Sequence, residues 1–112
     1  MSWTAVAQRR AVGHVFTGVR EFVLIRGDGT EIAGRVAGLL SAPVAQGDAW
    51  RCTNEGIIEF PPFARTEAAE AVGIAVYDGP ERLATVPMGA VAVAERVQVV
   101  LRPRDLWVGV SQ

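Results

Sequence analysis

Apolar residues recur at every second position in several short segments of this chain, and turn-forming residues separate these segments. The clearest case is segment 22–34, in which FVLIR is followed by Gly-Asp-Gly and then by TEIAG. Glycine and aspartate accept the positive φ angles of tight turns, so segment 22–34 predicts a β-hairpin. Six or seven short strands at such intervals predict an all-β fold, an antiparallel β-sandwich.

Further strands are predicted over 71–77, 81–88, 96–102 and 106–110. In the first of these, alternation places Val72, Ile74 and Val76 on one face and small residues on the other, where another strand or sheet can approach closely. In the last two, the residues expected on one face are Val97, Val99 and Leu101, then Leu106, Val108 and Val110.

The segment NEGIIEFP (54–61) has a defined beginning and end. Alternation places Ile58 and Phe60 on one face together with Gly56, and places Ile57 and Glu59 on the other. The following Pro-Pro ends the ladder because proline has no N–H to donate. Before this strand, residues 40–56 mix turn formers with isolated apolar residues and predict a long connection plus an irregular strand. After it, Thr66 is expected to cap a single helical turn.

The N-terminal segment is the exception to the period of two. Val12, Val15 and Phe16 follow helical spacing, Ala5 and Arg9 extend the same face, and Gly18 can terminate the helix. The sequence therefore predicts one short helix over about 4–17, followed by strands from about residue 21 onward.

Composition sets the broad class. A chain of 112 residues closes one hydrophobic core, so residues 1–112 are expected to form a single β-sandwich domain. Half of the residues are apolar and the mean hydropathy is +0.25, which predicts surface covered by partners and hence a homo-oligomer. All 11 basic residues are arginine, as in proteins of GC-rich genomes. Their scatter and the net charge of −1 argue against nucleic-acid binding.

Targeting signals are absent from the sequence pattern. Arg9 and Arg10 interrupt the only apolar stretch near the N-terminus, which is the wrong order for a secretory signal. No apolar run is long enough to span a membrane. The single cysteine, Cys52, cannot form an intrachain disulfide. These features predict a soluble chain made in the cytosol.

The side chains that could carry chemistry are few. His14 and Cys52 are the only residues of their types, and no third group is evident to orient a nucleophilic pair, so a structural cysteine and a helix-face histidine are expected. Three aspartates adjoin glycine without calcium-loop spacing, and two glutamates resemble a glycosidase pair without a framework: Asp28, Asp48, Asp78, Glu55 and Glu59. No phosphate-binding glycine loop is present. The prediction is a non-enzyme with no metal and no cofactor.

Four residues are the first candidates for an interface. Trp50 lies in a turn-rich segment, and Trp107 alternates out of phase with its apolar neighbours, so either ring can face a partner subunit. For Trp107, filling of the core is the equal alternative. Arg102 and Arg104 lie in an expected exposed turn, where an interface salt bridge is the second reading. Exposed aromatic rings would also suit a sugar-binding platform.

The order and spacing of these segments resemble a family of small structural proteins of tailed bacteriophages, the minor tail or tail-fibre-like proteins. The family pattern begins with a helix N-x-x-L-x-x-x-F-x-G, and continues with E-I-x-G, N-x-x-x-I-x-F-P, V-G-I-x-D and a last hairpin. Here AVGHVFTG, TEIAG, NEGIIEFP and VGIAVYDG stand in that order, over about residues 12–110, with extra residues before Asp78. PERLATVPM replaces the glycine-rich segment of the family, and the A-G-D-x-x-x-x-x-A-G turn is missing.

This resemblance implies a non-enzymatic virion protein, made in the host cytoplasm and assembled with other virion proteins. A minor tail or tail-tip component is the first expectation, and a capsid decoration protein is the alternative within the class. A carbohydrate-binding module for the host surface is the alternative from another class. An exposed groove with aromatic rings favours that module, whereas aromatic rings buried between chains favour the structural role.

Overall fold

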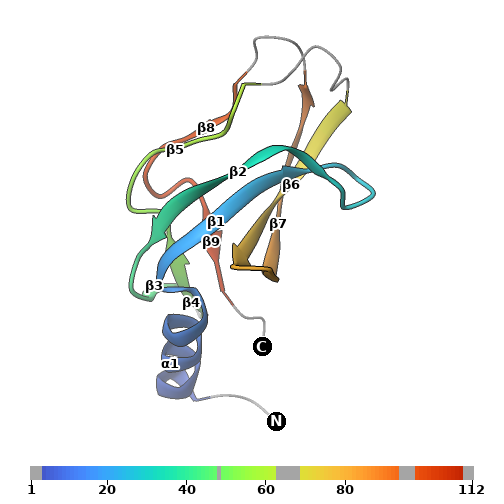
Figure 1. The fold of residues 1–112 in the computed structure, drawn as a ribbon. Coiled ribbons are helices and arrows are strands. Elements are labelled where there is room, and N and C mark those ends of the chain that lie inside the picture. The colour runs from blue at the N-terminus through green and yellow to red at the C-terminus, as the bar shows by residue number, and fades with distance from the viewer. Residues whose placement is uncertain (1–3, 48, 63–68, 94–97, 110–112) are drawn as a thin grey trace.

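The computed structural model describes residues 4–47, 49–62, 69–93 and 98–109. In these ranges the chain forms an N-terminal helix followed by antiparallel strands (Figure 1). The elements are α1 (Ala5–Phe16), β1 (Gly18–Ile25), β2 (Glu31–Leu40), β3 (Val44–Gln46), β4 (Ala49–Thr53), β5 (Ile58–Glu59), β6 (Ala69–Asp78), β7 (Glu81–Val93), β8 (Val100–Leu101) and β9 (Trp107–Val108). The predicted fold class, all-β with one short N-terminal helix, is confirmed.

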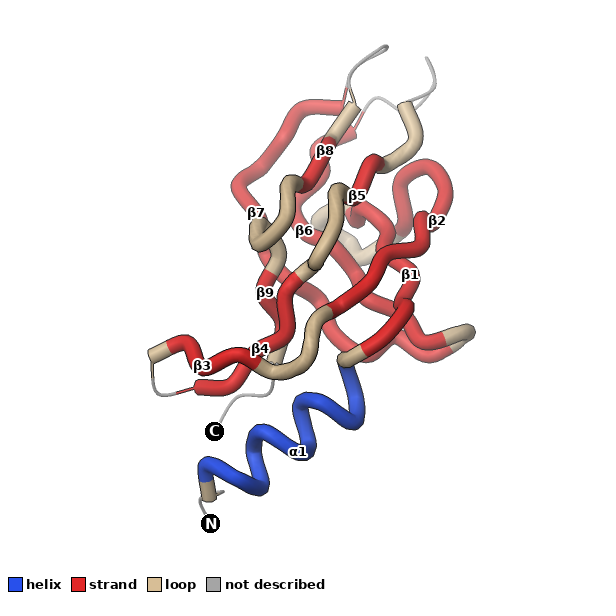
Figure 2. Tube along the Cα trace, turned by 90° about the vertical axis from the view of Figure 1, so that its left-hand side faces the viewer, coloured by secondary structure: helices blue, strands red, loops and turns tan. Residues whose placement is uncertain are grey.

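The strands form a sandwich of one large sheet and two small ones. The large sheet has the order β2-β1-β6-β7. Across the core from it lie the sheet β3-β4-β9 and the pair β5-β8 (Figures 1 and 2). The main core fills the space between them, with Phe22, Leu24, Ile58 and Phe60 among its largest members. Helix α1 packs against β4 at one end of this core.

The side chain of Thr4 caps the first turn of the helix, and the backbone amide of Thr17 caps its last turn. The hydroxyl of Thr4 accepts a hydrogen bond from the Ala7 amide at 3.1 Å, and the amide of Thr17 donates to the Gly13 carbonyl. The guanidinium of Arg20 donates to the carbonyl of Val15, one of the last-turn acceptors that a helix leaves without a partner. The predicted helix over 4–17 is confirmed.

The buried face of the helix differs from the predicted one. Gln8, Val12 and Phe16 are buried, at a spacing of four residues, whereas Ala5 and Arg9 are exposed. The prediction extended the face of Val12 and Phe16 through Arg9, whereas the structure buries the neighbouring Gln8 and leaves Arg9 exposed. Within the described part of the chain, the buried Nε2 of Gln8 has no hydrogen-bond partner, which is a free-energy cost that packing of this face must offset.

The hairpin predicted over 22–34 is confirmed, and its strands extend well beyond that segment. The carboxylate of Asp28 accepts hydrogen bonds from the amide and hydroxyl of Thr30, and Gly29 has a φ of 86°. These contacts fix the turn and thereby the register of β1 with β2. The hydrogen bonds from Thr30 hold the pKa of the Asp28 carboxyl below its usual value.

The prediction of a long connection over 40–56 is wrong in part, because most of this segment is a second hairpin. Strand β3 pairs with β4 from Val44 opposite Arg51 to Gln46 opposite Ala49. Gly47, in the turn between them, has a φ of 60°. The hairpin was not predicted because β3 is short and mostly exposed, so its apolar residues show little periodicity.

The alternation predicted for 71–77 is interrupted by an irregularity between Ala71 and Gly73 in the pairing of β6 with β7. Ala71 therefore joins Ile74 in the main core, while Val72 is only half-buried. Residues 69–70, predicted to belong to a helical turn, begin β6 instead, and the rest of that turn, including Thr66, lies outside the described residues.

The predicted faces of the later strands agree with the structure. Ile58 and Phe60 are buried, Ile57 is exposed, and β5 ends before Pro61, although Gly56 is exposed rather than buried. The residues predicted inward in the last strands are Val99 and Leu101, which pack partly buried against the core, and Leu106 and Val108, which are buried. Val97 and Val110 lie outside the described residues.

Candidate functional site: a hollow and an outer apolar row

A buried asparagine ties together segments that are far apart in the sequence. Asn54 is fully buried, and its Nδ2 donates hydrogen bonds of 2.8 Å to the carbonyls of Gly56 and Arg102. Its Oδ1 accepts from the amide of Leu106 at 2.9 Å, and its own carbonyl accepts from the amide of Arg104 at 3.0 Å. We call these contacts the Asn54 bracket. It fixes the turn between β8 and β9 to the segment that leads into β5.

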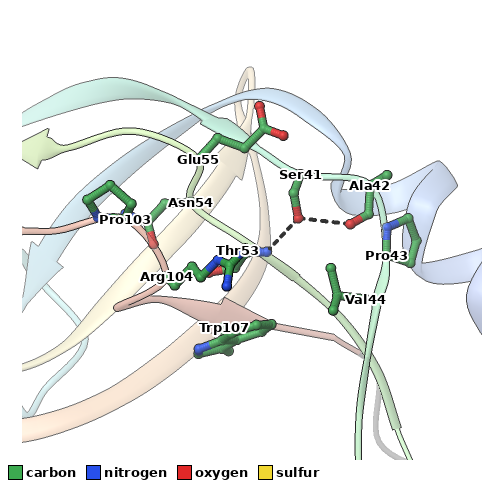
Figure 3. A pocket seen from close by; sticks show the side chains of 10 residues that line it. All are labelled: Ser41, Ala42, Pro43, Val44, Thr53, Asn54, Glu55, Pro103, Arg104 and Trp107. Atoms are coloured by element: carbon green, nitrogen blue, oxygen red, sulfur yellow. Dashed lines mark hydrogen bonds between the residues drawn. The ribbon is translucent and has the colours of Figure 1, made fainter.

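A hollow of about 540 Å³ lies beside the Asn54 bracket (Figure 3). Its lining comes from the β2–β3 connection, the end of β4 and the β8–β9 turn: Ser41, Ala42, Pro43, Val44, Thr53, Asn54, Glu55, Pro103, Arg104 and Trp107. Figure 3 shows Trp107 on one side and Glu55 on the other, with Thr53, Asn54 and Arg104 between them. The hollow thus contains an aromatic ring and a cation, and the carboxylate of Glu55 lies at its rim, turned away from Trp107.

Buried polar groups in the wall of the hollow bond to one another. The Ser41 hydroxyl donates to the Ala42 carbonyl and accepts from the Thr53 amide. The Thr53 hydroxyl donates to the carbonyl of Leu106 at 2.7 Å. Because Asn54 is also fully engaged, these groups hold the wall in shape and are not free to bind a ligand.

The structure brings two of the four predicted interface residues together. Trp107, half-buried on β9, and Arg104, exposed on the preceding turn, both line the hollow. Arg104 has a φ of 69°, a left-handed conformation that favours glycine, and its amide is held by the Asn54 bracket. Its guanidinium has no hydrogen bond or ion pair within the described ranges.

The other two predicted interface residues lie elsewhere. Trp50 is half-buried on β4, with the guanidinium of Arg9 5.5 Å from its ring centre. The side chain of Arg102 is 83% exposed and forms an ion pair of 3.7 Å with Asp105 inside the same turn. The turn over 102–105 is therefore exposed, as predicted, and the salt bridge is intramolecular.

Four exposed apolar residues form what we call the outer apolar row, and of these the sequence pattern had placed only Ile57 on a face away from Ile58 and Phe60. They are Val19 (66% exposed), Leu39 (45%), Ile57 (61%) and Val100 (44%). The sequence indicates these residues only weakly, because each is the outward residue of an alternating strand whose other face belongs to the core.

Strand pairing places the members of the outer apolar row near one another. Val19 lies opposite Leu39 on β1 and β2, and Val100 lies opposite Glu59, two residues beyond Ile57. The carbonyl of Leu39 accepts a hydrogen bond from the amide of Glu55. This bond joins β2 to the segment that leads into β5. Figure 2 shows β1, β2, β5 and β8 side by side.

The opposite face of the large sheet carries a second, smaller core around Tyr77, formed with Val23, Ile25 and Ala75. The guanidinium of Arg35 lies 3.7 Å from the centre of the Tyr77 ring and bonds to Glu31 at 3.1 and 3.2 Å. Arg82 donates to the Tyr77 hydroxyl at 2.9 Å. The hydrogen bonds from Arg35 lower the pKa of Glu31, and Glu31 in turn raises the pKa of Arg35. We call these four side chains the Tyr77 cluster: Glu31, Arg35, Tyr77 and Arg82.

The two unique side chains do not form a nucleophilic pair. His14 is exposed on α1, whereas Cys52 is fully buried, with its sulfur 3.5 Å from the Thr17 hydroxyl and 3.9 Å from the Val12 carbonyl. Burial raises the pKa of the Cys52 thiol, so the neutral form, a poor nucleophile, predominates at pH 7.

The acidic residues singled out in the sequence are spread over the molecule. Asp28 serves its hairpin turn, Asp78 is exposed at the end of β6, and Asp48 lies outside the described residues. Glu55 and Glu59 are both exposed, and only Glu55 lines the hollow. Among the residues that the structure describes, no three metal-ligating side chains cluster. Nor is any described helix long and apolar enough to cross a membrane.

Comparison with known proteins adds no relative. No protein-family model, no curated protein and no solved structure matches the chain.

Proposed function

We propose that this chain is a non-enzymatic structural protein of a tailed-phage virion or a phage-derived particle, a minor tail or tail-tip component. It acts by packing against copies of itself and against other virion proteins. It is made in the host cytoplasm and resides in the virion. The proposal rests on the resemblance of the sequence to small tail proteins and on the surface described above.

The residues that carry the resemblance have structural roles in this fold. In the pattern N-x-x-x-I-x-F-P, Asn54 makes the bracket, Ile58 and Phe60 are core residues, and the strand ends before Pro61. The fixed positions of this pattern thus coincide with buried contacts, as is expected of a pattern that specifies a fold. This agreement between the pattern and the buried contacts supports the proposal.

The outer apolar row is the observation that carries an interface function. Its four large apolar side chains are between 44% and 66% exposed and lie on neighbouring strands. A specific interface commonly removes about 800 Å² per partner from water, and apolar side chains at its centre supply most of the stabilisation. Partner subunits that cover β1, β2, β5 and β8 would bury this row.

Two measurements test the proposal. Sedimentation of the purified chain should show a concentration-dependent oligomer, and the chain should co-purify with particles from the producing host. Leu39→Glu should weaken both, because it places a charge in the row. Thr85→Glu, at an exposed position on β7, should leave both unchanged. A chain that stays monomeric and never co-purifies with particles would show that the proposal is wrong.

Particle mapping separates tail from head. Labelling of purified particles at the tail tip supports the minor tail role, whereas labelling over the capsid surface supports the decoration role. The hollow lined by Trp107 favours the carbohydrate-binding alternative, since it contains a half-buried aromatic ring.

A further inference from the structure

The hollow has the size and construction of a ligand site. Its volume of about 540 Å³ falls within the roughly 300–1,000 Å³ that is usual for small-molecule sites. Its wall is held by the Asn54 bracket and by the hydroxyls of Ser41 and Thr53. Because these contacts exist without a ligand, little conformational entropy is lost when a ligand enters.

Three side chains are left to recognise that ligand. Trp107 offers the face or edge of a half-buried indole, Arg104 offers a guanidinium, and Glu55 offers a carboxylate. Neither charged group has a hydrogen bond or ion pair in the portion of the chain that the structure describes. We propose that the hollow binds a neutral saccharide, with one sugar ring stacked on Trp107 and hydroxyl groups of the saccharide held by Arg104 and, at the rim of the hollow, by Glu55.

Charge and polarity select this class of ligand. One cation and one anion give the hollow no net charge, so it favours neither an anionic nor a cationic ligand. A neutral pyranose ring has an apolar C–H face, which packs on an indole, and a rim of hydroxyls that both donate and accept. A guanidinium donates to hydroxyl oxygens and a carboxylate accepts from hydroxyl protons, and both bonds are strengthened by charge.

An extended peptide fits this wall less well. Peptides that join a sheet as an extra strand require unpaired backbone groups at the edge. Around the hollow, the amides of Ser41, Thr53, Glu55 and Arg104 are all engaged in internal hydrogen bonds. A peptide would therefore find side chains alone, without the backbone ladder that gives such complexes their affinity.

The saccharide site does not depend on the proposed virion location, because it can be tested on the isolated chain. The full chain, labelled with nitrogen-15, is titrated with maltotriose, cellotriose, triacetylchitotriose and methyl galactoside at millimolar concentrations. At least one of these should move the indole N–H signal of Trp107 in a saturable way. The indole signal of Trp50, which lies beside Arg9 and not in the hollow, should stay in place.

Arg104→Gly is the decisive variant. It removes the guanidinium at a position whose φ of 69° suits glycine, so the backbone of the wall is preserved. Loss of a charge-assisted hydrogen bond to the sugar should weaken affinity by about tenfold or more. Glu55→Gln should weaken it by a smaller factor, since the amide still accepts one bond. Trp107→Ala should abolish binding, and Trp50→Ala is its matched control.

Three results would overturn the proposal. The first is the absence of any Trp107 signal change with all four sugars. The second is sugar binding that Arg104→Gly and Glu55→Gln both leave at full strength. The third is capture of a virion protein that these two variants abolish while no sugar binds, because the hollow would then be a protein-docking site. Arg104→Gly carries the test even where Trp107→Ala fails to fold.

Discussion

The two faces of the large sheet bury side chains by different means. Its inner face packs on β5, β8 and β9 across the main core, where the side chain of Asn54 is fully buried. Its outer face buries Tyr77 under the side chains of Arg35 and Arg82, which remain in contact with water. A polar network without water is costly to break, whereas a solvated one is not. The inner face should therefore dominate stability.

The largest expected effect is that of Asn54→Ala. This change leaves the carbonyls of Gly56 and Arg102 and the amide of Leu106 without their partner, which should lower the free energy of unfolding by about 3 kcal/mol. Urea denaturation followed by circular dichroism measures the loss. Gln98→Ala, which removes a single bond to the Phe60 carbonyl from an exposed side chain, should cost about 0.5 kcal/mol. Equal losses would contradict the ranking of buried polar contacts above solvated ones.

Gly38→Ala should come next. A Cβ at Gly38 would lie 2.8 Å from the Phe22 ring and 3.2 Å from the Ile58 side chain, so β2 and β5 could not keep their separation. Overpacking of this kind costs about 2 kcal/mol. Gly34→Ala on the same strand meets only Pro61 at 3.9 Å and should be neutral within about 0.5 kcal/mol. Similar unfolding midpoints for the two variants would show that the inner face tolerates expansion.

Cys52→Ala should cost about 1.5 kcal/mol, because the cavity it leaves is small. The thiol of the unchanged protein should react with iodoacetamide on the order of 100-fold more slowly than in the unfolded chain. Mass spectrometry reports this rate without ambiguity, since Cys52 is the only cysteine. Rapid alkylation of the folded protein would mean that the helix α1 opens readily from β4.

The smallest effect is expected on the outer face, from Glu31→Gln. The pKa of Glu31 is lowered in the folded state, so its contribution to stability is present above its ordinary value of 4.5 and is lost as the pH falls below it. The variant should match the parent at low pH and fall only slightly below it at pH 7, with a difference that salt reduces. Glu81→Gln, at an exposed position, is the control. A large, salt-independent loss would contradict this ranking.

Much of the fold could be predicted from local signals. Gly-Asp-Gly between apolar runs specified the β1–β2 hairpin, and the helical spacing of Val12, Val15 and Phe16 specified α1, because turns and helical periodicity act within a few residues. Alternation alone placed Ile58 and Phe60 in the core. These features depend on residues that are close together in the sequence, so the sequence alone is enough to predict them.

Features that depend on distant residues could not be read in this way. The bonds of Asn54 reach 48 and 52 residues along the chain, so nothing adjacent to it marks it as a bracket. The irregularity after Ala71 reverses an alternation that looks regular in the sequence. Trp107, Arg104 and Glu55 line the same hollow. From the sequence, Glu55 was a candidate only as one half of a carboxylate pair.

The Asn54 bracket also sets an order of events during synthesis. Residues 54–60 are made early, yet their hydrogen-bond and packing partners at 98–106 come about 40 to 50 residues later. Contacts of such sequence separation form slowly because loop closure must precede them. A ribosome-bound chain that stops short of Leu106 cannot complete the Asn54 bracket, because the amide that donates to Asn54 Oδ1 is not yet made. Completion of this core must therefore wait until Leu106 and β9 have left the ribosome.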